Sequence, residues 1–135
     1  MKGKYWMKNE ISTAGNLIKI IEDSRNNAWK KVNEELIRMY WNVGEYLSKE
    51  AENQEAFPGI KGFNRRGLYR MKKFYETYYN DEFVTTLLTQ ISWSNHLAIM
   101  SKAKTAEERH FYMTLCIKES YSARELDRQI NSGYY

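Results

Sequence analysis

Residues 57–79 read FPGIKGFNRRGLYRMKKFYETYY and join a break in the chain to the start of a basic helix. Pro58 and Gly59 interrupt any helix that precedes them. Asn64 is a suitable N-cap, because its side-chain oxygen can accept a hydrogen bond from a free backbone N–H of the first turn. The spacing predicts a helix from Arg65 to Tyr79. The side that it buries is expected to hold Leu68, Met71, Tyr75 and Tyr78.

The same segment supplies the positive charge of the chain. The chain has 21 basic and 17 acidic side chains. Six of the basic ones lie between Pro58 and Tyr75, where there is no acid, and without them 15 basic side chains face 17 acidic ones. The six are Lys61, Arg65, Arg66, Arg70, Lys72 and Lys73. So concentrated a basic patch attracts a phosphate backbone.

The predicted helix places part of this charge on one side. At 100° per residue, Arg66, Arg70 and Lys73 lie opposite the apolar side, with Tyr69 beside them. Arg65 and Arg66 fall in the first turn, where positive charge opposes the helix dipole. Arginine can bind guanine or phosphate with two hydrogen bonds, and lysine suits phosphate. The pattern predicts nucleic-acid binding by the six basic residues and Tyr69, and a solvated basic face is the alternative.

The rest of the chain predicts an all-α fold, a compact bundle of six or seven helices. With 135 residues, one Pro and seven Gly, the chain reads as a single domain over 1–135, with residues 1–24 as an extension. Helices are expected at about 11–23, 25–52, 83–91 and 92–104. Thr105 and Ser122 begin sequences typical of capping boxes, and two further helices follow them. The helix at 92–104 is expected to bury Trp93, Leu97 and Met100.

The helix predicted at 25–52 carries a broad apolar stripe that we expect to face the core. Its members are Trp29, Val32, Leu36, Met39, Tyr40, Val43 and Leu47, widened by Ile37 and Trp41. A stripe of this width exceeds what one small core covers, so a homodimer is a further possibility. The short connection before Phe57 favours exchange of helices between two such subunits.

Residues for catalysis or metal binding are few. His96 and His110 lie on separate predicted helices, and neither belongs to a metal-spaced motif. Cys116 lies in an apolar context typical of a core residue. Glu107 and Glu108 stand in a first helical turn, where acids are structurally favoured. We expect no enzyme activity, no cofactor and no metal. The single cysteine favours a cytoplasmic protein, and because no segment is apolar over the length of a membrane span, we expect no contact with a membrane.

These motifs also resemble a known family. FPGIKGFNRRGLYRMKKFYETY is similar to the F-P-G-x-x-G-F-S-R-R-N-L-x-x-M-x-x-F-Y motif of the YhcG family. The similarity extends over about 28–135, through VNEELIRMYWNVGEYL, ISWSNHL with its Trp93 and His96, and SARELDRQI. The resemblance implies a helix-turn-helix-like, DNA-binding N-terminal domain that precedes a PD-(D/E)XK nuclease domain. It implies that Asn64, Arg65 and Arg66 begin a recognition helix, so Asn64 joins the residues that we expect to bind nucleic acid. It places Arg124, Glu125 and Arg128 in the closing helix, as ion pairs or surface groups.

Two functions follow from this resemblance. The chain ends at Tyr135, about where the nuclease domain would begin, so we expect no phosphodiesterase activity. The first function is a non-catalytic DNA-binding module. The alternative is a protein-binding inhibitor or adaptor of a nucleic-acid enzyme, such as a phage or mobile-element anti-defence protein with a nuclease or defence complex as its partner.

Overall fold

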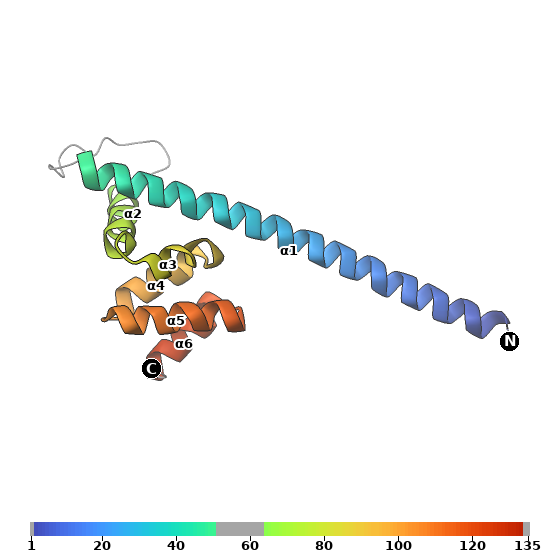
Figure 1. Cartoon of the computed structure of the whole chain (residues 1–135). Coiled ribbons are helices and arrows are strands. Elements are labelled where there is room, and N and C mark those ends of the chain that lie inside the picture. The colour runs from blue at the N-terminus through green and yellow to red at the C-terminus, as the bar shows by residue number, and fades with distance from the viewer. Residues whose placement is uncertain (1, 51–63, 134–135) are drawn as a thin grey trace. The chain divides into compact units, whose positions relative to one another are not determined.

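A computed structural model describes residues 2–50 and 64–133. Every regular element in these residues is a helix, which confirms the predicted all-α fold (Figure 1). The elements are α1 (Lys2–Glu50), α2 (Arg65–Tyr78), α3 (Glu82–Thr85), the 3-10 helix η2 (Leu88–Gln90), α4 (Trp93–Lys102), α5 (Ala106–Glu119) and α6 (Ala123–Asn131). The chain divides into two units, residues 1–32 and residues 33–135.

Helix α1 replaces two predicted helices with one. We expected separate helices at about 11–23 and 25–52, and the structure has a single helix that includes the first range and continues through the second as far as Glu50. No Pro or Gly lies between Asn16 and Val43, so nothing there interrupts the helix. Gly15 costs only about 1 kcal/mol relative to alanine, which a helix of this length tolerates.

The side of α1 that faces the core differs from the predicted one. Asn33, Ile37, Gly44 and Leu47 are buried. The stripe residues expected to be buried but found exposed are Trp29, Val32, Leu36 and Met39. The helix carries two apolar stripes, and the narrower one packs against the core of residues 33–133. The prediction was wrong for these four exposed residues. It was right for Ile37 and Leu47, which are buried, and the remaining predicted residues are half-buried against the core: Tyr40, Trp41 and Val43.

Two residues of α1 explain which side of the helix packs against the core. Gly44 lies against α2, and a Cβ atom added to it would come within 2.1 Å of the backbone oxygen of Met71. The Nδ2 of Asn33 donates to the backbone oxygens of Thr89 at 3.0 Å and Ile91 at 3.1 Å. Only a glycine permits so close an approach, and only a polar side chain satisfies those carbonyl groups. These two contacts fix the rotation of α1 about its own axis.

Helix α4 also turns a different side to the core than predicted. Asn95, His96 and Ile99 are buried, and the residues predicted to be buried are only half-buried: Trp93, Leu97 and Met100. The His96 Nε2–H donates to the backbone oxygen of Leu88 at 2.8 Å. The Asn95 Nδ2 donates to the backbone oxygen of Tyr121 at 3.0 Å. These hydrogen bonds allow polar side chains to occupy the core.

The predicted helix starts agree with the structure. The Thr105 hydroxyl accepts a hydrogen bond from the Glu108 N–H at 3.1 Å, and the Ser122 hydroxyl accepts one from the Glu125 N–H at 3.3 Å. In the first capping box, the Glu108 carboxylate accepts a hydrogen bond from the N–H of Lys104, which is one residue before the N–H of Thr105 that a standard capping box uses. The helix predicted at 83–91 is present as α3 and η2.

Candidate nucleic-acid interface

Helix α2 begins at the predicted cap. The Asn64 side-chain oxygen accepts a hydrogen bond from the Gly67 N–H at 2.7 Å. The cap fixes the first turn of the helix, which holds Arg65 and Arg66. The Asn64 side-chain oxygen, which we predicted to contact nucleic acid, is therefore engaged by the backbone of the helix. Lys61, predicted as a further contact, lies outside the described residues.

The two sides of α2 differ sharply in chemistry. The buried side holds Leu68, Met71, Phe74 and Tyr78. Phe74, rather than the predicted Tyr75, is fully buried, and Tyr75 is half-buried at the edge of the helix. The opposite side holds four exposed residues: Arg66, Tyr69, Arg70 and Lys73. We call these four residues the basic face.

The cations of the basic face have no partner among the described residues. No hydrogen bond or ion pair engages the side chains of Arg66, Arg70 or Lys73 among the side chains described, those of residues 12–50 and 64–133, and the same holds for the exposed Arg65. Lys72 differs, because its side chain is only 19% exposed and its Nζ lies 3.8 Å from a Glu76 carboxylate oxygen. The charge available to a ligand is therefore on the basic face and at Arg65.

The basic face borders a cleft of about 460 Å³. α4 and α6 supply the other lining residues: Leu97, Ala98, Met100, Ser101, Lys102 and Asp127. The Lys102 Nζ lies 2.8 Å from an Asp127 carboxylate oxygen, so these two opposite charges neutralise each other. The lining as a whole has four basic side chains and one acidic one, and its net charge is positive. The sequence did not indicate the α4 and α6 wall of this cleft.

A cluster of rings supports α2 from beneath. The Phe74 ring centroid lies 5.1 Å from that of Trp93, 5.6 Å from that of Tyr78 and 4.9 Å from that of His96. The Trp93 and Tyr78 rings meet Phe74 nearly edge to face, a favourable arrangement for aromatic pairs. The basic face is therefore carried by a helix with a firmly packed underside.

A family model for the DUF1016 N-terminal domain matches residues 51–135, which is more than half of the chain. The chain belongs to this family. The match confirms the resemblance to the N-terminal domain of YhcG-like proteins. No curated protein and no solved structure matches the chain significantly. The helices that the structure describes include none that is both long enough and apolar enough to cross a membrane.

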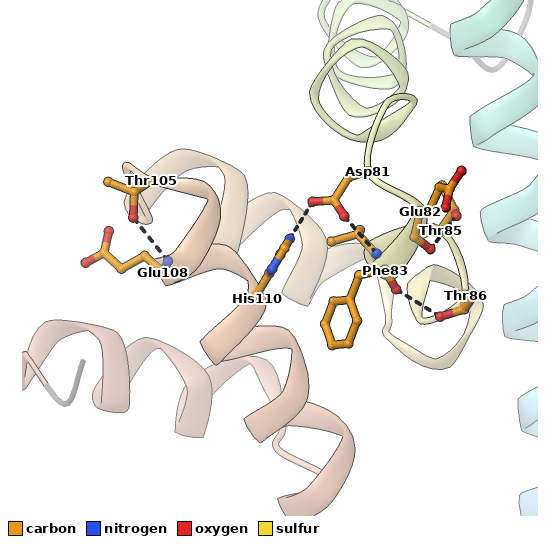
Figure 2. A network of polar contacts seen from close by, with 9 residues as sticks. Asp81, Glu82, Phe83, Thr85, Thr86, Thr105, Glu108 and His110 are labelled. Carbon is orange, nitrogen blue, oxygen red and sulfur yellow. Dashed lines mark hydrogen bonds and ion pairs between the residues drawn. The ribbon is translucent and has the colours of Figure 1, made fainter.

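In this DUF1016 N-terminal domain, Asp81 connects the end of α2 to α5. Figure 2 shows the Asp81 carboxylate between two partners, the backbone N–H of Val84 and the imidazole of His110. The Asp81 bond to Val84 caps α3, and the ring of Phe83 lies against His110 with centroids 5.1 Å apart. Although burial raises the pKa of Asp81, the hydrogen bonds from His110 and Val84 outweigh it and lower this pKa below its usual value.

Replacing Asp81 with asparagine is expected to lower the free energy of unfolding at neutral pH by about 1–2 kcal/mol, because asparagine keeps the cap but loses the charged bond to His110. Urea denaturation of Asp81→Asn, His110→Gln and the double variant would measure the coupling. The folded-state pKa of Asp81 is lowered, so this stabilisation is present above about pH 4 and is lost as pH falls through the lowered pKa. Additive effects of the two substitutions would contradict the direct bond.

The groups that could support catalysis occupy structural positions in this domain. His96 is fully buried, and burial raises the pKa of the Cys116 thiol to about 12, which keeps it protonated. Glu108 is bound to the backbone at the start of α5, as is typical of a helix N-terminus. Glu125 and Arg128 form an ion pair on α6 at 3.1 Å. Among the described residues, no group of three or more possible ligands could hold a metal ion.

Proposed function

We propose that this domain is a non-catalytic DNA-binding module whose contact surface is the basic face of α2 and the cleft beside it. The observation that carries the proposal is the exposure of Arg66, Arg70 and Lys73 without an ion pair among the described residues. Three cations on one side of a helix repel each other, and Arg66 also opposes the helix dipole. A polyanion relieves both costs. DNA offers a dense row of phosphate charges for such a face to bind.

Each member of the basic face has a role in this proposal. Arg66 and Arg70 can each hold a phosphate with two hydrogen bonds, and Lys73 acts as a point charge between them. Tyr69 is 51% exposed among these cations, so its ring can pack on a sugar or a base and its hydroxyl can bind phosphate. The packed underside of α2 fixes the backbone positions of these side chains before binding, which reduces the entropy lost on association. The single buried cysteine is consistent with action in the cytoplasm.

Replacing both Arg66 and Arg70 with alanine is expected to weaken binding to duplex DNA by about tenfold or more. It should also reduce the slope of log affinity against log salt by about two, since two phosphate contacts are lost. Fluorescence anisotropy with a labelled duplex, a single strand and an RNA at several salt concentrations measures both quantities. The ratio of the three affinities identifies the preferred nucleic acid.

The matched control is Lys19→Ala with Lys30→Ala. Both lysines are exposed residues of α1, so the net charge falls by the same amount without any change in the basic face. This control is expected to keep the salt slope of the unmodified protein. Equal slopes in the arginine double variant and the unmodified protein would rule out the basic face as the contact surface. Absence of binding to all three probes at low salt would overturn the proposal.

A further inference from the structure

The first unit of the chain carries an apolar stripe that neither the core nor the proposed DNA contact uses. All the residues from Ser12 to Val32 are exposed. They include five large apolar side chains that recur at helical spacing: Leu17, Ile18, Ile21, Trp29 and Val32. Helices without tertiary contacts are only marginally stable in water, and an amphipathic helix gains most of its stability by packing its apolar side.

We propose that residues 14–32 of α1 pair with the same residues of a second copy, in antiparallel orientation and centred near Asp23. The stripe has the three-four spacing of a two-stranded coiled coil. Ile18, Arg25 and Val32 occupy the a positions of its heptads, and the d positions hold Ala14, Ile21 and Ala28. This spacing brings the a and d residues to one side of the helix, where a second helix can bury them.

Arg25 decides the orientation of the pair. In a parallel pair each a residue faces its own equivalent, so two Arg25 side chains would meet within the seam and repel each other. In an antiparallel pair the a residues layer against d residues, which places Arg25 beside Ile21 of the second copy. Its guanidinium then reaches Glu22 of the second copy. Along the seam the two Arg25 guanidinium groups thus lie beside the two Glu22 carboxylates, and the two Asp23 side chains lie on the outer side of the helices.

The sizes of the side chains support the same register. With the pair centred near Asp23, Ile18 packs on Ala28 of the second copy, and Val32 packs on Ala14. Large residues thus meet small ones along the seam, as close packing requires. Trp29 lies over Gly15 of the second copy, where the space around a Cβ atom is open to 4 Å. This contact explains a glycine in the middle of a helix, where it otherwise only costs stability.

The test of pairing is the mass of the full chain in solution. The unmodified protein is expected to sediment at twice 16.2 kDa, and Ile21→Asp at 16.2 kDa at the same micromolar concentration. Ile20→Asp is the matched control, because Ile20 is 61% exposed and Ile21 is 50% exposed, but Ile20 lies about 100° further around the helix, off the side that holds the a and d residues. This control is expected to remain a dimer. A monomeric unmodified protein, or equal effects of the two substitutions, would overturn the proposal.

The orientation is tested by disulfide formation in the full chain. In the proposed pair Ser24 lies close to Ser24 of the second copy, so Ser24→Cys is expected to form a disulfide-linked dimer on mild oxidation. Ala28→Cys is expected to remain unlinked, because Ala28 meets Ile18 instead of its own equivalent. Cys116 is buried, and oxidation of the unmodified protein is the control for any disulfide that this native cysteine forms. Linkage of Ala28→Cys without linkage of Ser24→Cys would show a parallel pair and overturn the proposal.

Discussion

Replacing Gly44 with alanine is expected to lower the free energy of unfolding by about 3 kcal/mol, a large fraction of the stability of a small domain. The added Cβ atom would lie 2.1 Å from the Met71 backbone oxygen and 2.8 Å from the Met71 carbonyl carbon. It would also lie 3.0 Å from the Cβ atom of Tyr75. No rotamer change relieves a contact with backbone atoms, so α1 and α2 must separate. The packing of the cluster that Leu47 forms with Leu68 and Met71 then loosens as well.

Urea denaturation measures this effect, and Gly15→Ala is the control on the same helix. The space around Gly15 is open and the residue lies in the exposed first unit, so alanine there is expected to change the free energy of unfolding by no more than about 0.5–1 kcal/mol, and only upwards. Both substitutions are best compared in the Ile21→Asp background, where the proposed pairing does not contribute. A Gly44→Ala protein as stable as its parent would contradict the close contact of the two helices.

Between pH 6.5 and pH 4, the free energy of unfolding is expected to fall by about 3 kcal/mol because of His96 alone. Burial lowers the pKa of His96 to about 4, despite the hydrogen bond to the Leu88 carbonyl, which raises it. In the unfolded chain the imidazole takes up a proton near pH 6.5. The unfolded state therefore binds one more proton than the folded state across this window. The contribution of His96 is complete above the window and is lost as the pH falls through it.

The variant that isolates this effect is His96→Gln. A glutamine amide can still donate to the Leu88 carbonyl but does not titrate, so its unfolding free energy is expected to be nearly independent of pH between 6.5 and 4. His110→Gln serves as the comparison and is expected to keep the slope that His96 gives. Denaturant midpoints at closely spaced pH values provide the measurement. An unmodified protein with constant stability across this window would show that His96 is not buried in the neutral form.

Local features of the fold could be predicted from the sequence, because they depend on neighbouring residues. The caps at Asn64, Thr105 and Ser122 each need one side-chain oxygen and one nearby N–H, and all three are present. The buried side of α2 followed from its spacing, apart from the exchange of Tyr75 for Phe74. The two aromatic residues are adjacent, and only the ring cluster beneath α2 distinguishes them.

The side of α1 that packs could not be predicted in the same way. The helix has two apolar stripes, and spacing alone favours the longer one. Gly44 was the available signal, since a glycine inside a strong helical pattern often marks a close approach of another backbone. The cleft beside the basic face depends on α4 and α6, which are distant in sequence from α2. No pattern within α2 indicates which helices lie beside it.

Asn33 of α1 is buried, and its side-chain amide donates hydrogen bonds to the carbonyl groups of Thr89 and Ile91. Residues 12–32, which precede Asn33, are all exposed, so they can be exchanged without loss of a buried side chain. Recombination at this point of the gene would give the protein a new first segment and a new binding partner. The remaining helices would keep their structure. A single side chain thus marks the boundary between an interchangeable segment and the helices that pack around one core.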